Sequence, residues 1–186
     1  MVGVDNVTFE TDYPHTDSTW PHTKKIAMDM TSALDPDVVR KIMRGNAMSS
    51  LTDFLFSGVL VRFPDLKLAY SEGQIGWIPY ILERADKVWE DNRAWGGVAD
   101  KVPMPPSTYY YRQIYGCFFD DEHGLDSLEK VGIDNTTFET DYPHSDSTWP
   151  HTLETAKKLM GHLPADVIYK IVRGNAIRML SLDLAE

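Results

Sequence analysis

The stretch FETDYPHSDSTWPH at residues 138–151 occurs a second time, as FETDYPHTDSTWPH at residues 9–22. The similarity runs without a gap from residues 2–48 to residues 131–177, and roughly 29 of 47 positions are identical. A repeat spaced this widely is not a solenoid, whose units are about 20 to 50 residues long. The chain therefore contains one supersecondary unit twice, with different sequence between the copies.

Each copy predicts a short buried strand followed by a loop and helices. The β-rich residues 6–10 and 135–140 follow Asp-Asn turn signals. The Asp-Tyr-Pro-His turn comes next, so the carboxyl end of each strand carries an aspartate and a histidine into a loop. In the first copy, proline and capping residues predict helices over residues 24–33 and from residue 36 to Gly45-Asn46.

The sequence between the copies alternates helices and strands. It predicts a helix over residues 49–63, a strand over 66–70, a helix over 76–95, a loop over 96–108 that is a candidate lid or partner surface, a strand over 114–119 and a short helix over 126–131. Strands that alternate with helices indicate an α/β fold with about four parallel strands. In such sheets the chemistry lies beyond the carboxyl ends of the strands.

Acidic and histidine side chains follow each predicted strand. They are Asp12 and His15, then Glu72, then Asp120, Asp121 and His123, and finally Asp141 and His144. If the strands are parallel, these groups meet at one edge, close to Trp77 and Trp149. The alternative for Asp120, Asp121 and His123 is that they cap the next helix, and for Asp141 that it is a turn residue.

Three segments together resemble the amidohydrolase-related family. They are LKLAYSEG at residues 66–73, IPYILERAD at residues 78–86, and the ETDYPH turn at residues 139–144 that is closed by RGNA at residues 173–176. That family consists of metal-dependent TIM-barrel hydrolases, with decarboxylases of the aminocarboxymuconate-semialdehyde type among them. The resemblance covers residue 47 to the end and implies part of a TIM barrel, with strands six, seven and eight at residues 66–71, 114–119 and 135–140.

The resemblance also implies roles for residues in the strand-end loops. Asp141 would be the strand-eight aspartate, either a metal ligand or a base, with His144 as a second catalytic residue. Glu72 could hold a divalent metal, zinc or manganese, through oxygen. Substrate contacts would come from Trp77, His123 and Trp149, and Asp12 with His15 would form a possible duplicate site.

The sequence departs from the family in its first part. No His-x-His pair exists here, and the strand-five histidine has no counterpart because residues 1–48 are a second strand-eight unit. We expect a single domain over residues 1–186, consisting of the duplicated unit 1–48 and a barrel segment 49–186 that contains the second copy, 131–177. Four strands cannot close an eight-stranded barrel, so two chains could complete one barrel as a homo-oligomer.

The composition argues against some classes of partner and predicts a cellular location. A formal net charge of −10 argues against a nucleic-acid partner. No apolar run approaches the roughly 18 to 20 residues of a membrane span, and one cysteine fits a reducing compartment, so we expect a cytoplasmic protein.

Three hypotheses remain open. The chain is a shortened hydrolase or decarboxylase that acts on a small-molecule substrate, or a chimeric fragment without a complete site. The third hypothesis is a non-catalytic partner of a full-length relative.

Overall fold

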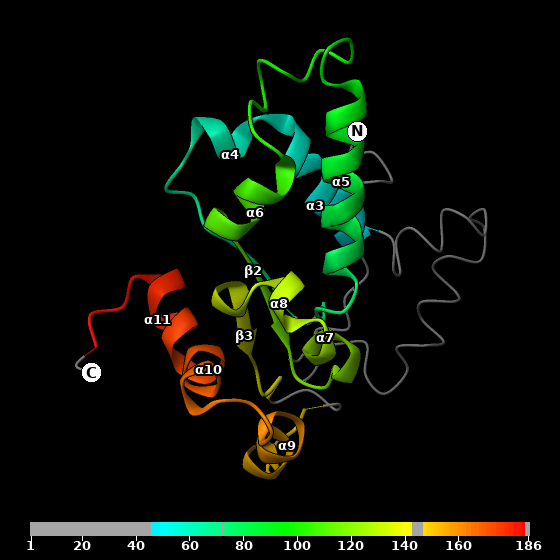
Figure 1. Cartoon of the computed structure of the whole chain (residues 1–186). Helices are drawn as coiled ribbons and strands as arrows, with labels where there is room; N and C mark the ends of the chain where they lie inside the picture. Colours follow the sequence, from blue (N-terminus) through cyan, green and yellow to red (C-terminus); the bar gives the residue numbers. More distant parts are fainter. Residues whose placement is uncertain (1–45, 72, 143–146, 185–186) are drawn as a thin grey trace, which may run out of the picture.

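The computed structural model describes residues 46–71, 73–142 and 147–184. The predicted strand at residues 6–10 and the helices after it lie outside these ranges. Within them, three strands form one open sheet in the order β1-β2-β3, with both pairs parallel (Figure 1). Their bounds are Leu68–Tyr70 for β1, Ile114–Phe118 for β2 and Thr136–Phe138 for β3. The three strands and their parallel direction confirm the prediction, although each strand is shorter than expected.

The centre of the fold is β2, in which all five residues are buried. A Cβ atom at Gly116 would lie 2.8 Å from Ile78 Cδ1 and 2.9 Å from Ile75 Cγ2. Because glycine has no side chain, the segment from Ile75 to Ile78, where the helix Ile78–Asn92 begins, packs directly against β2. Buried aliphatic and aromatic side chains from the surrounding helices complete the core around β2.

Helices surround the sheet. In Figure 1, α3, α4, α5 and α6 lie above the strands, α10 and α11 lie to the left of β3 and below the left end of α6, and α9 lies at the bottom. The helices before β2 are α3 (Asn46–Ser57), α4 (Val59–Arg62), α5 (Ile78–Asn92) and α6 (Pro106–Gln113). Those after it are α7 (Glu122–Asp126), α8 (Leu128–Val131), the short turn η3 (Ile133–Asn135), α9 (Thr152–Met160), α10 (Ala165–Tyr169), the π-helical η4 (Lys170–Gly174) and α11 (Asn175–Leu180).

Two helix predictions and one loop prediction need correction. The single helix expected over residues 49–63 is broken into α3 and α4, because Gly58 adopts a left-handed backbone with φ of 78°. The loop expected over residues 96–108 ends in α6, which begins with a proline in its first turn. The helix expected at 126–131 is two short helices, and the first starts earlier because Asp121 caps it.

The segment 96–108 is fastened to α5 at two points. The Trp89 indole donates to the Val102 backbone oxygen at 2.7 Å, and Val102 is fully buried. The Asp86 carboxylate accepts from the backbone and the hydroxyl of Ser107, at 2.9 and 2.6 Å. These bonds position the start of α6.

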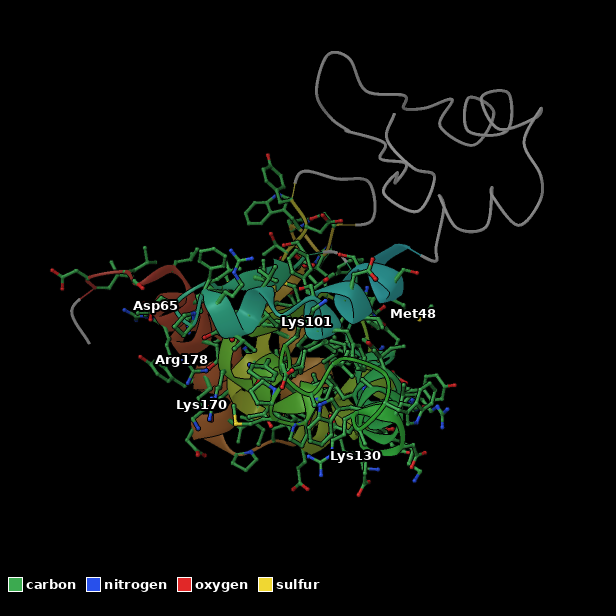
Figure 2. The ribbon with its side chains drawn as sticks, turned by 90° about the horizontal axis from the view of Figure 1, so that it is seen from above. Met48, Asp65, Lys101, Lys130, Lys170 and Arg178 are labelled. Atoms are coloured by element: carbon green, nitrogen blue, oxygen red, sulfur yellow. The ribbon has the colours of Figure 1, made fainter. Side chains whose placement is uncertain are left out.

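The C-terminal helices are tied to β3 and to the turn before it. The Asn175 side chain donates to the backbone oxygens of Ile133 and Thr136, both at 2.7 Å. Lys170 and Arg178 lie on the same side of the molecule (Figure 2), and both form ion pairs with Asp134, at 3.0 and 3.7 Å. These polar contacts therefore hold η4 and α11 against η3 and β3.

Among the residues described, no helix combines the length and the apolar character that crossing a membrane requires.

Candidate functional site

The carboxylate of Asp121 joins the loop after β1 to the loop after β2. Its Oδ2 accepts hydrogen bonds from the backbone N–H groups of Ile75 and Gly76, at 2.8 and 2.7 Å. Its Oδ1 accepts from Gly124 N at 2.8 Å, which caps α7. The carboxyl ends of the two strands therefore meet at one edge, as predicted. The sequence indicated the cap but not the bonds to the β1 loop, because nothing in the sequence pairs residues so far apart.

Two of the predicted substrate residues lie beside this junction. The Trp77 indole donates to the backbone oxygens of Gly73 and Gln74, at 2.8 and 3.1 Å, and its ring makes an edge contact with Tyr70. Trp77 is half-buried, and its two hydrogen bonds hold the loop after β1 in place. His123 is exposed on α7 and its ring lies close to Gly76. Asp120 is exposed at the end of β2.

The end of β3 turns sharply at Asp141, which is half-buried and has a left-handed backbone with φ of 54°. The Thr140 backbone oxygen accepts from the Ser147 hydroxyl at 2.7 Å and from Thr148 N at 3.0 Å, which closes the base of this loop. Tyr142 and Trp149 are exposed and pack edge to face, with ring centroids 5.7 Å apart. The predicted substrate residue Trp149 therefore stands beside the loop that carries Asp141.

The end of β3 also lies at the shared edge. Glu139 N donates to the Phe118 backbone oxygen at 2.9 Å, which extends the pairing of β3 with β2 up to the loop. The other predicted site residues, Glu72, His144, Asp12 and His15, lie outside the described residues. In the described part of the chain no three His, Cys, Asp or Glu side chains gather in a way that could hold a metal ion. These residues alone do not fit the metal that the family resemblance implies.

Cys117 is not poised as a nucleophile. Burial in the middle of β2, together with the nearby Glu139 carboxylate, raises the pKa of the Cys117 thiol to about 12, against the opposing hydrogen bond from Thr137. The thiol therefore stays protonated at neutral pH. Burial likewise raises the pKa of the Tyr70 hydroxyl, which makes a 3.1 Å hydrogen bond with Ser50.

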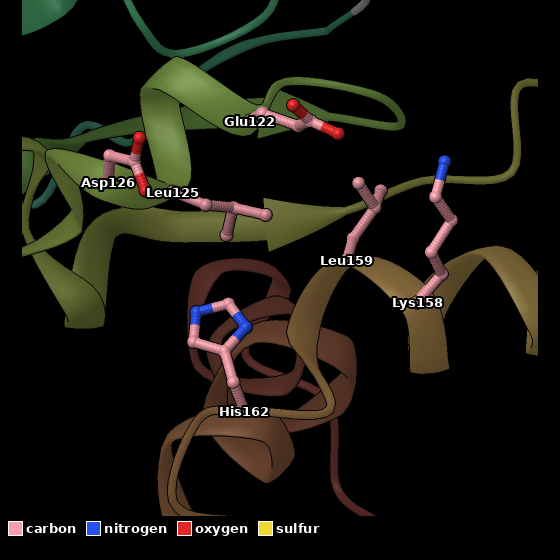
Figure 3. Close-up of a pocket in the computed structure, with 6 residues that line it drawn as sticks. All are labelled: Glu122, Leu125, Asp126, Lys158, Leu159 and His162. Atoms are coloured by element: carbon pink, nitrogen blue, oxygen red, sulfur yellow. The ribbon is translucent and has the colours of Figure 1, made fainter.

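A separate hollow of about 220 Å³ lies between α7 and α9 (Figure 3). Two leucines, three charged side chains and a histidine line it, namely Glu122, Leu125, Asp126, Lys158, Leu159 and His162. Figure 3 shows the His162 ring pointing toward the α7 side chains. The hollow contains none of the predicted site residues, and His162 is exposed.

A comparison with protein families matches residues 1–49 and 48–182 to the family described as Amidohydrolase. The chain belongs to the amidohydrolase family. This confirms the resemblance that the 66–73, 78–86 and 139–144 segments indicated. A search of the curated proteins finds no match.

Solved structures of longer chains show the same fold. One is 5-carboxyvanillate decarboxylase LigW from Sphingomonas paucimobilis, with 24% identity and a TM-score of 0.59 over 72% of this chain and 39% of that one. An amidohydrolase from Mycobacterium avium subsp. paratuberculosis K-10 has 20% identity and a TM-score of 0.65 over 85% of this chain and 40% of that one. A dihydroxybenzoic acid decarboxylase from Polaromonas sp. JS666, with bound manganese and the inhibitor 2-nitroresorcinol, has 20% identity and a TM-score of 0.58 over 89% and 48%.

The match covers only part of each of these solved structures. The chain spans between 39% and 48% of the length of the structures it resembles. The described residues of this amidohydrolase-family chain form three parallel strands in an open sheet, which corresponds to part of a TIM barrel. The predicted fold class is therefore confirmed.

Proposed function

We propose that this chain carries the strand-eight part of the active site of a decarboxylase or hydrolase that acts on a small organic acid. The observation that carries the proposal is the position of Asp141. This carboxylate follows β3 at the edge where the ends of all three strands meet, in a segment that belongs to the amidohydrolase family. Parallel α/β sheets use this edge for chemistry.

The role of Asp141 in this proposal is proton transfer. A carboxylate in a strand-end loop can take a proton from a substrate or return one to the carbon that loses a carboxyl group. The exposed Tyr142 and Trp149 rings beside it offer an apolar surface to a flat acid. Two of the similar structures are decarboxylases of aromatic acids by name, which supports this substrate class.

A metal would need ligands beyond the described residues. Glu72 and His144 are the candidates within the chain, and a second chain of a homo-oligomer is the other source. The similar decarboxylase from Polaromonas holds manganese, which supports manganese as the ion, with zinc as the other candidate. When bound, such an ion would polarise the substrate.

The experiment measures release of carbon dioxide from dihydroxybenzoic acid and from 5-carboxyvanillate, with and without added manganese or zinc. We expect turnover by the unmodified chain and a loss of roughly 100-fold or more in the Asp141→Asn variant. The matched control is Asp91→Asn, which removes an exposed carboxylate on α5. Equal activity of the Asp141→Asn variant would contradict the role of this residue.

A second candidate function is a catalytically incomplete fragment, or a non-catalytic partner of a full-length relative. It is favoured by the span of less than half of each similar structure. A folded chain that binds no manganese or zinc in equilibrium dialysis and releases no carbon dioxide would support this function and overturn the first.

A further inference from the structure

The strand β3 is a fixed support for the loop that carries Asp141. Just before the strand, Asn135 is buried, and its Nδ2 atom donates to three backbone oxygens at the end of α6 and the start of β2, at 2.7, 3.1 and 3.3 Å. Just after the strand, Glu139 N donates to the Phe118 backbone oxygen at 2.9 Å. Hydrogen bonds therefore anchor β3 at both ends, and the loop begins at residue 140.

The backbone oxygen of Thr140 accepts hydrogen bonds from the two residues that end this loop. The Ser147 hydroxyl lies 2.7 Å from it, Thr148 N lies 3.0 Å from it and the Thr148 hydroxyl lies 3.3 Å from it. The Thr148 hydroxyl is also 3.1 Å from the hydroxyl of Thr152, so it is shared between two partners. A carbonyl oxygen has two lone pairs, and the two shorter bonds match them.

The Ser147 hydroxyl is at the same time a donor and an acceptor. It donates to the Thr140 backbone oxygen and accepts from Trp149 N at 3.1 Å. The Trp149 ring packs on the ring of Tyr142, which follows Asp141 in the chain. One small side chain therefore joins the start of the loop to the aromatic pair beside the carboxylate.

The bond to Thr140 bears on Asp141 because both residues contribute to the same peptide unit. That unit is planar, so a partner that holds the Thr140 oxygen also fixes the direction of the N–Cα bond of Asp141. Asp141 has a φ of 54°, a left-handed backbone that a residue with a Cβ atom adopts only at a cost in free energy. Without the Ser147 bond, we expect Asp141 to relax toward a negative φ, which would point its carboxylate in another direction.

We propose that Ser147 is a positioning residue, whose hydroxyl holds Asp141 in the backbone conformation from which the carboxylate transfers a proton. This inference rests on the proposed function, because it concerns the step assigned there to Asp141. Ser147 acts through the peptide unit of Thr140 and Asp141 and makes no contact with the substrate in this mechanism.

Three variants test the role of the hydroxyl. Ser147→Ala removes it, Ser147→Thr keeps it, and Ser57→Ala is the matched control. The Ser57 hydroxyl has the same pair of bonds at the end of α3, since it donates to the Phe54 backbone oxygen and accepts from Val59 N, both at 3.1 Å. We expect the release of carbon dioxide from dihydroxybenzoic acid to fall roughly tenfold in Ser147→Ala and less than twofold in the other two variants.

A double variant shows whether Ser147 acts through Asp141. Adding Ser147→Ala to Asp141→Asn should change the residual release of carbon dioxide less than twofold, because the carboxylate that Ser147 positions is already absent. An equal loss from Ser147→Ala in both backgrounds would contradict the inference. So would a Ser147→Thr variant that is as slow as Ser147→Ala.

Fluorine NMR gives a second measurement, which does not depend on activity. The chain contains five tryptophans, and in protein labelled with 5-fluorotryptophan the signal of Trp149 is the one that disappears in Trp149→Phe. We expect Ser147→Ala to move this signal toward its position in the urea-unfolded chain, because Ser147 binds Trp149 N. Ser147→Thr and Ser57→Ala should leave it in place. A signal that Ser147→Ala does not move would overturn the inference.

Failure of this inference and failure of the proposed function give different results. No release of carbon dioxide by the unmodified chain would overturn the proposed function, and the fluorine signal then decides whether Ser147 holds the loop. Release by the unmodified chain that Ser147→Ala leaves unchanged would overturn the role of Ser147 alone.

Discussion

Asp121 shows how one side chain positions two loops of the candidate site. Its two carboxylate oxygens accept three backbone hydrogen bonds, two from the loop after β1 and one from α7. Backbone N–H groups of such loops need partners when water is excluded from them. The relative position of Trp77 and the start of α7 therefore depends on this carboxylate.

We predict that Asp121→Ala lowers the free energy of unfolding by about 3 kcal/mol, because three backbone donors lose a charged acceptor. Urea unfolding followed by tryptophan fluorescence measures the change. The control is Asp120→Ala, which removes the exposed neighbouring carboxylate and should cost less than about 0.5 kcal/mol. Similar losses in the two variants would contradict the role of Asp121.

The raised pKa of Cys117 predicts that the stability of the fold and the reactivity of the thiol depend on pH. The pKa of its thiol is about 12 in the folded chain, above the ordinary value of 9.0, because burial disfavours the thiolate. The stability that the buried, protonated thiol contributes is fully present below pH 9 and is lost as the pH rises toward 12. At pH 8 we expect iodoacetamide to alkylate the folded chain about a thousandfold more slowly than the urea-unfolded chain. Rates that agree within tenfold would contradict this prediction.

At the scale of elements, local sequence patterns predicted the type of most segments and the tertiary contacts set their ends. Apolar residues at helical spacing predicted one helix over residues 49–63, but the chain turns at Gly58. A Cβ atom at Gly58 would lie 3.2 Å from the Lys101 backbone oxygen. The break therefore depends both on the φ of 78° and on a segment 43 residues later in the chain.

Gly58→Ala and Gly97→Ala separate these two effects. Both glycines have positive φ values, but a Cβ atom at Gly97 has no neighbour within 4 Å. We expect Gly97→Ala to cost about 1 kcal/mol for the left-handed backbone, and Gly58→Ala to cost about 1 kcal/mol more because the Lys101 segment must move. Urea unfolding of both variants tests this, and an equal cost would show that the contact contributes nothing.

At the scale of the whole molecule, the described part of the chain has a buried core that lies within residues 51–171 and surrounds β2. The helices before and after β2 both contribute to it, so the described part of the chain has its own hydrophobic core.

We predict that a chain shortened to residues 46–186 still folds cooperatively, because every residue of that core is retained. The near-ultraviolet circular dichroism of the shortened chain should keep the aromatic signals of Trp89 and Tyr110, which are buried there. Loss of these signals, or a urea transition without cooperativity, would show that residues 1–45 are needed for folding.

The sequence by itself determined the alternation of strands and helices, the duplicated unit and the family, because these depend on local patterns and on repeated strings. The same patterns predicted that strand ends meet at one edge, and the parallel order β1-β2-β3 confirms it. Only the tertiary structure decided that Asp121 binds the β1 loop and that Asn135 binds three carbonyls of α6 and β2. Such bonds join residues 21 to 46 positions apart, and a local pattern carries no information about which distant groups the fold brings together.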